Sequence, residues 1–197
     1  RPHSPFDAPQ FYFDLYSNKD LPAPFIGDWA HMHDVPEDAA DPEAWRGKRK
    51  DEEIHRARAG YYGSIHHIDH QIGRLIRFMK KQRLLQNTII VFTSDHGDMM
   101  GDHYMWRKTY AYEGSAHVPL IVKLPPSMKI QQQRFVDAPV LLQDIMPTLL
   151  DAAGLDIPET VDGKSMLGVL QGEDTSARKY VHGEHSTCYS EEQEMQF

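Results

Sequence analysis

One apolar run that stops at a polar turn constrains the fold of this chain more than any other feature. The run covers residues 89–92 (IIVF), and no polar residue alternates within it. β-branched residues without alternation are typical of a strand that is buried on both faces, as in a parallel sheet. The pattern therefore predicts an α/β protein in which this strand lies inside the sheet.

A carboxylate and an imidazole follow this run directly. Asp95 and His96 come after the short polar link at residues 93–94, and Gly97 comes next. Ligands of open α/β sheets bind at the C-terminal ends of strands, and a glycine lets the backbone approach a ligand closely. Carboxylate oxygen and imidazole nitrogen both bind divalent metal ions. The turn thus fits half of a metal site, whereas the alternative is that Asp95 only caps a following helix.

Composition excludes several classes of protein. The 197 residues suffice for one sizeable domain with its own core. The formal net charge of −8 argues against a nucleic-acid partner. No apolar run approaches the roughly 18 residues that a transmembrane helix needs. A single cysteine, Cys188, excludes an internal disulfide and a cysteine-only metal cluster. These features leave the cellular compartment open.

The N-terminal part and the segment after it have opposite characters. Residues 1–25 contain five prolines, so we expect an extended loop there with no more than a short helical turn. The loop continues to about residue 47, and a long irregular segment of this kind is often functional. Residues 48–85 then show the strongest helical pattern, with acidic residues near the start and basic residues near the end. Its apolar stripe should cover one face of the sheet; the stripe consists of Ile54, Tyr61, Ile65, Ile68, Ile72, Leu75, Ile76 and Met79.

The later part of the chain predicts alternating strands and helices. A second short strand is expected at residues 117–124, where two prolines end it, and a weaker third strand at 134–140. A helix at 143–153 should close at Gly154, and a short helix is expected at 165–170. Residues 180–182 fit one more strand.

Two histidines on the long helix form a separate candidate site. His66 and His70 are four residues apart and so lie on one face of the helix, where they could bind zinc. They lie off the apolar stripe, however, and a solvated face is the favoured interpretation.

Five segments carry a resemblance to one family. They lie in the family's order between residues 2 and 154, and the chain resembles the sulfatases of the alkaline phosphatase superfamily. The segments are PHSPF (2–6), the YY…I..ID..IGRL pattern (61–75), NTIIVFTSDHG (87–97), K….YEGS..VPL (108–120) and D..PTLL…G (144–154). The resemblance implies part of an alkaline-phosphatase-like central, mostly parallel sheet that is flanked by helices.

The resemblance also implies roles for individual residues. Asp95 and His96 would be two ligands of a divalent metal ion, usually Ca²⁺ in this family. Lys108 would hold the sulfate oxygens and the leaving-group oxygen. His3 would bind the substrate from the opposite side or act as general acid. These roles make chemical sense, because cations stabilise an anionic transition state and a departing alkoxide needs a proton.

Three further residues near these motifs have weaker claims. Glu113 is interpreted as structural, holding the loop after Lys108. Arg107 and His103 are candidate pocket residues, although a surface position is favoured for both.

The departures from the family's pattern matter as much. The formylglycine nucleophile of sulfatases arises from a C-x-P-S-R motif, which this chain lacks, and Cys188 has no matching proline or arginine. The family's first Asp-Asp metal pair is also missing. We therefore expect residues 1–175 to be the C-terminal part of a catalytic α/β domain, with 1–47 as its active-site loop region. Residues 176–197 would begin a truncated C-terminal subdomain. The remainder of its own polypeptide would be the partner, and the chain alone would be inactive.

Three functions compete at this stage. The first is hydrolysis of sulfate monoesters, either small molecules or glycans. The second is hydrolysis of phosphonate or phosphate monoesters, which the Asp-His-Gly turn fits equally well. The third is a non-catalytic binding domain on the same scaffold.

Overall fold

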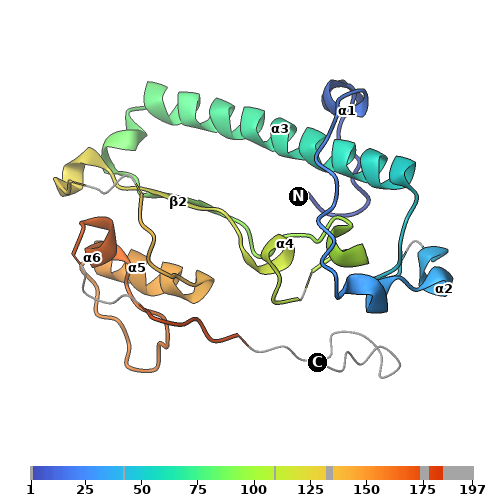
Figure 1. Ribbon diagram of the computed structural model, residues 1–197. Helices are drawn as coiled ribbons and strands as arrows, with labels where there is room; N and C mark the ends of the chain where they lie inside the picture. Colours follow the sequence, from blue (N-terminus) through green and yellow to red (C-terminus); the bar gives the residue numbers. More distant parts are fainter. Residues whose placement is uncertain (1, 42, 109, 132–134, 174–177, 184–197) are drawn as a thin grey trace. The chain divides into compact units, whose positions relative to one another are not determined.

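A computed structural model describes residues 2–41, 43–108, 110–131, 135–173 and 178–183, and it shows a mixed α/β chain (Figure 1). The chain divides into two compact units, which are described separately. Unit 1 comprises Arg1–Leu84 and His96–Leu120, and unit 2 comprises Leu85–Asp95 and Ile121–Phe197. No described helix combines the length and the apolar character needed to cross a membrane.

The long helix predicted for residues 48–85 is confirmed as α3 (Asp51–Lys81) in unit 1. Acidic residues occupy its first turn and two lysines its last turn, which suits the helix dipole. The Glu53 carboxylate accepts the backbone N–H of Lys50 at 3.0 Å and so caps the start. The predicted apolar stripe is not fully covered, since Ile65 is 43% exposed and Leu75 is 56% exposed.

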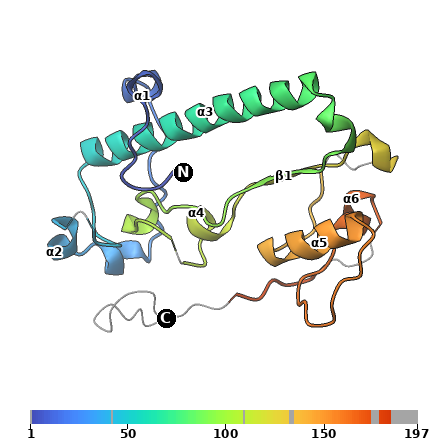
Figure 2. The ribbon, with the colours of Figure 1, turned by 180° about the vertical axis from the view of Figure 1, so that it is seen from behind.

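A second helix lies across α3 where only a loop was expected. Helix α1 (Gln10–Ser17) forms two turns in the N-terminal segment and packs against α3 (Figures 1 and 2). The expectation of no more than a short helical turn is wrong here. Pro9 takes the N-cap position and the next proline is Pro22, so the residues between are free to form a helix.

Two glycines of α3 create the space for this packing. A side chain at Gly60 would place its Cβ 2.2 Å from the Phe6 carbonyl oxygen. A side chain at Gly63 would come within 3.0 Å of Ala8 and Tyr12. Only residues without a Cβ let the N-terminal segment lie this close to the helix.

The rest of unit 1 consists of short elements and loops. One buried arginine of α3, Arg58, ties the helix to two of these segments, the loop at Pro22 and the turn at residues 100–102. Its guanidinium donates to the carbonyls of Met100 and Pro22 at 3.1 and 2.7 Å and to the Asp102 carboxylate at 2.8 Å. The short elements are η1 (Ala30–His33), α2 (Pro36–Ala39), η3 (Asp102–Tyr104) and α4 (Glu113–Ala116).

The sheet of the described chain has two strands, β1 (Ile90–Thr93) and β2 (Leu120–Lys123). Figures 1 and 2 show that they run in opposite directions. The expectation that the first strand is buried on both faces is wrong for this structure, because no residue of β1 is fully buried and Phe92 is 38% exposed. The central, mostly parallel sheet stays a prediction.

Unit 2 also contains the predicted C-terminal helices. Helix α5 (Ile145–Ala152) confirms the helix expected at 143–153, and Gly154 follows its end with a φ of +70°. Helix α6 (Leu167–Leu170) is the short helix expected at 165–170. Two 3₁₀ turns, η4 (Pro126–Met128) and η5 (Leu142–Asp144), complete the unit, while η2 (Leu84–Asn87) precedes β1.

Two predicted strands are not formed. Residues 135–140 and 180–182 are irregular, so the strands expected at 134–140 and 180–182 are wrong for these described residues; Arg134 itself lies outside them. Phe135 is 78% exposed and Tyr180 is 76% exposed. Neither segment pairs with a strand of the described sheet, and an isolated extended segment gains no ladder hydrogen bonds.

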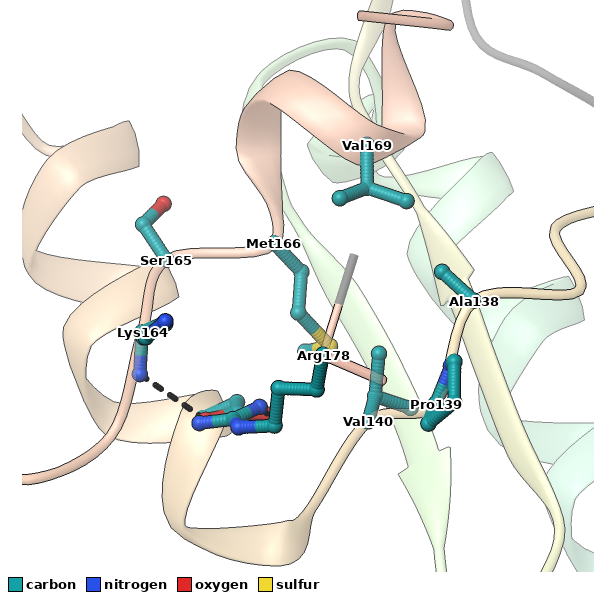
Figure 3. A pocket seen from close by; sticks show the side chains of 9 residues that line it. Ala138, Pro139, Val140, Lys164, Ser165, Met166, Val169 and Arg178 are labelled. Carbon is teal, nitrogen blue, oxygen red and sulfur yellow. Dashed lines mark hydrogen bonds and ion pairs between the residues drawn. The ribbon is translucent and has the colours of Figure 1, made fainter. Parts of the chain in front are cut away.

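A buried carboxylate organises the C-terminal part of unit 2. Asp144 is fully buried, and its two oxygens accept hydrogen bonds from the Arg178 guanidinium. The same carboxylate accepts the backbone N–H groups of Leu141 and Lys164, both at 2.8 Å. Figure 3 shows Arg178 beside Met166 at the small cavity next to this cluster. One side chain thus connects three separate stretches of the chain.

Candidate active site

The two predicted metal ligands follow the end of β1. Asp95 is exposed, and its Oδ1 lies 3.4 Å from the Ser94 hydroxyl. The Nδ1 atom of His96 lies 2.8 Å from the Gly97 carbonyl oxygen. Because a carbonyl can only accept, Nδ1 carries the hydrogen and the lone pair of the neutral ring is on Nε2. A backbone carbonyl that fixes the tautomer in this way is typical of metal-binding histidines.

Gly97 holds this turn against the segment that follows Lys108. Its N–H donates to the Ser115 carbonyl at 2.8 Å. A Cβ at position 97 would lie 2.1 Å from the Gly114 carbonyl oxygen, so any side chain would force the two segments apart. The DHG turn and the YEGS segment of the sequence therefore form one structural feature.

The structure brings together His3 and Lys108, which are 105 residues apart. The Lys108 Nζ donates to Nε2 of His3 at 3.0 Å. The opposite ring nitrogen of His3 donates to the Ser4 carbonyl at 2.7 Å, which leaves the lone pair on Nε2. His3 is exposed and Lys108 half-buried, so both side chains can be reached by a substrate.

Asp98 is a site residue that the sequence reasoning missed. Its Oδ1 accepts the backbone N–H groups of Met100 and Arg107 at 3.0 and 3.2 Å. Burial raises the pKa of this carboxyl; the two backbone hydrogen bonds and the charge of Lys108 lower it in part. Its position inside the polar turn after the strand was the available signal, but residue type alone did not show which atoms it contacts.

The two candidate pocket residues are less exposed than expected. Arg107 is half-buried and forms an ion pair with the Glu43 carboxylate. His103 lies against the Trp29 ring at a centroid distance of 4.6 Å, and its Nδ1 accepts the Gly27 N–H at 3.1 Å. Neither side chain simply projects into solvent.

Three other predicted positions have clear contacts. Glu113 accepts a hydrogen bond from the His117 ring at 2.6 Å, and both side chains are exposed; the structural role of Glu113 stays a prediction. His66 and His70 face α1, where their Nδ1 atoms lie 3.3 and 2.9 Å from the hydroxyls of Tyr16 and Tyr12. The expected solvated face is therefore incomplete. Cys188 lies outside the described residues.

The donors present fit part of a metal site. Within the described ranges, no three His, Cys, Asp or Glu side chains gather so that they could hold a metal ion. Asp95 and His96 nevertheless offer one oxygen and one nitrogen donor at adjacent positions, and the His96 tautomer leaves its lone pair on Nε2. These two side chains would be part of a ligand set that needs further donors.

Comparison with known proteins shows the family of the chain. A family model described as Sulfatase matches residues 2–155. The chain is 47% identical over 187 residues to an arylsulfatase of Clostridium perfringens and 32% identical over 186 residues to a choline-sulfatase of Rhizobium meliloti. Among solved structures, the phosphonate monoester hydrolase SpPMH from Silicibacter pomeroyi matches with a TM-score of 0.74 and 34% identity.

These matches cover most of this chain but a minor part of each relative. The alignments include 94% of the chain against the arylsulfatase, 87% against the choline-sulfatase and 91% against the phosphonate monoester hydrolase. They include 39%, 34% and 37% of those proteins, respectively. The chain thus spans less than half the length of the relatives that it matches.

Proposed function

Because this chain belongs to the sulfatase family, we propose that it forms part of a hydrolase that acts on sulfate monoesters of small molecules or glycans. The observation that carries the proposal is the hydrogen bond between Lys108 and His3, which places an ammonium group and an imidazole side by side. The similarity to an arylsulfatase makes aryl sulfates the first substrates to test.

The chain's own residues would act on the substrate's oxygens. The Lys108 ammonium would bind the sulfate oxygens and oppose the negative charge that they carry through the transition state. His3 would bind from the other side or donate a proton to the departing oxygen. The fixed tautomer of His3 directs Nε2 toward Lys108, which is where both groups would meet the ester.

Asp95 and His96 would hold a divalent metal ion, and Ca²⁺ is the ion that the family resemblance implies. Such an ion supplies fixed positive charge beside the sulfate oxygens. We infer that the remaining ligands and the formylglycine nucleophile are contributed by the remainder of the polypeptide. On the same basis, β1 and β2 would belong to a larger, mostly parallel sheet, with residues 1–175 in the catalytic domain and 176–197 in the next subdomain.

Substitution of Lys108 and Asp95 in the full polypeptide tests this proposal. We expect Lys108→Ala and Asp95→Ala each to lower kcat/KM for an aryl sulfate by about 10²–10³-fold, because each removes stabilisation of transition-state charge. Lys123→Ala is the matched control, since Lys123 is exposed on β2. Calorimetry with Ca²⁺ should show weaker binding for Asp95→Ala only. Unchanged turnover in Lys108→Ala would refute the assigned site.

The solved phosphonate monoester hydrolase supports a second candidate function. Its fold matches 91% of this chain, and sulfate and phosphonate monoesters have similar shapes. Rates with an aryl sulfate and with a phenyl phosphonate monoester, measured on the same full polypeptide, decide between the two. A higher kcat/KM for the phosphonate ester would favour the second function.

A further inference from the structure

Asp98 connects the two segments that carry the candidate site residues. It lies two residues after His96, and its carboxylate accepts the N–H of Arg107, the residue directly before Lys108. The Arg107 carbonyl in turn accepts the N–H of Met99 at 2.7 Å. The backbone immediately before Lys108 is therefore fixed by hydrogen bonds to residues 98 and 99.

The charge of Asp98 acts on Lys108 as well. The carboxylate interacts electrostatically with the Lys108 ammonium. Tyr61 of α3 also lies within electrostatic range of it. A half-buried negative charge attracts an ammonium more strongly than an exposed one would, because water screens it less.

We propose that Asp98 is a positioning residue that sets the place of Lys108 relative to His96. Its oxygen fixes the backbone of the loop between them, and its charge attracts the Lys108 ammonium. This inference rests on the proposed function, in which Lys108 meets the ester and His96 holds the metal ion. Asp98 itself does not touch the substrate in this role.

Two substitutions separate the charge of Asp98 from its hydrogen bonds. Asp98→Asn keeps an oxygen that accepts both backbone N–H groups, but it removes the charge. Asp98→Ala removes both. In the full polypeptide, with an aryl sulfate as substrate, we expect Asp98→Asn to lower kcat by about 10-fold and Asp98→Ala by about 100-fold, since small displacements of a catalytic group have effects of this size.

The Michaelis constant and the thermal midpoint distinguish positioning from a purely structural role. KM should stay unchanged or fall in Asp98→Asn. The negative charge of Asp98 repels the anionic ester, and the substitution removes this repulsion. The thermal midpoint should not fall, because the neutral amide avoids the cost of burying a charge. The exposed Asp20, changed to Asn, is the control and should have the kinetics of the unsubstituted protein.

The outcomes separate this inference from the proposed function. Unchanged kcat in Asp98→Asn, together with the loss of activity in Lys108→Ala, would overturn the role of the Asp98 charge and leave the proposed function intact. A lower thermal midpoint that accounts for the lost activity would also overturn it. Full activity in Lys108→Ala would overturn both, because Asp98 acts through Lys108.

Discussion

Arg58 shows how one side chain can hold several loops in unit 1. Its donors reach two backbone carbonyls and one carboxylate, and the residue is only 9% exposed. Hydrogen bonds from a charged donor stabilise a protein more than neutral ones. The loops that Arg58 holds include the turn around Asp102, which precedes Lys108.

Replacement of Arg58 should therefore be costly. We expect Arg58→Ala to lower the free energy of unfolding by about 2–4 kcal/mol, because it leaves Asp102 and two carbonyls without this donor. Arg56→Ala is the matched control, since Arg56 is exposed on the same helix. Urea denaturation of both variants measures the difference. Equal values would show that the three contacts do not contribute to stability.

At the level of single residues, the sequence predicted only part of the candidate site. Asp95, His96, Lys108 and His3 could be selected because each lies in a recognisable motif. Asp98 and Arg58 could not, because their importance depends on the backbone groups that they contact, and nothing in a side-chain type reveals such partners. A charged residue is more often on the surface, so the residue type of Arg58 gave no signal of its buried position.

The prediction of helices and strands succeeded only as far as their local sequence patterns allowed. The helix at Asp51–Lys81 has a long apolar period and charged ends, and both signals are local. Helix α1 was missed because the prolines were counted over the whole window of residues 1–25. The strand prediction for residues 135–140 was wrong because a strand needs a neighbouring strand, and its neighbours cannot be read from its own residues.

Two glycines on the same helix give a test at this scale. Gly60→Ala should displace the N-terminal segment, because the new Cβ would lie 2.2 Å from the Phe6 carbonyl oxygen. We expect kcat/KM of the full polypeptide to fall by about 10-fold or more, as His3 moves away from Lys108.

Gly73→Ala supplies the control. A Cβ at Gly73 meets only the Arg77 side chain, at 3.4 Å. Alanine favours a helix over glycine by about 1 kcal/mol, so this variant should be fully active and equally or more stable. If Gly60→Ala were as active as Gly73→Ala, the close contact with the N-terminal segment would not position His3.

At the scale of the whole molecule, the sequence predicted the class but not the assembly. The α/β character followed from the order of predicted strands and helices along the chain. Each compact unit, in contrast, is made from segments that are distant in the sequence. One of the three boundaries between the units along the chain falls between Asp95 and His96, in the middle of the most informative motif. The motif that carries the candidate metal ligands therefore does not lie within one compact unit.

The Asp144 cluster predicts how acid affects unit 2. Burial alone raises the pKa of Asp144, but hydrogen bonds from Arg178, Lys164 and Leu141 outweigh it, and the net pKa is below the usual 3.8. The folded state therefore binds this proton less readily than the unfolded state. Its stabilisation is present above about pH 4 and is lost as the pH falls through the lowered value.

Asp144→Asn tests this linkage. At pH 7 the variant should lose about 3–5 kcal/mol of unfolding free energy, because the largely buried Arg178 loses its ionic partner. Its stability should also depend less on pH below 4 than that of the unsubstituted protein. The exposed Asp156, changed to Asn, is the control. An equally steep loss in acid for Asp144→Asn would contradict the assignment.

The contact between Lys108 and His3 has a consequence for which esters the site would bind. The Nε2 atom of His3 accepts a hydrogen from lysine, so in this state it has none to give to a departing alcohol. Catalysis by His3 as an acid would require this pair to separate and the ring to gain a proton. An anionic ester would interact favourably with both groups and so replace the hydrogen bond that is lost when they separate, whereas an uncharged ester would not. The resting arrangement would thus discriminate by charge before any bond is broken.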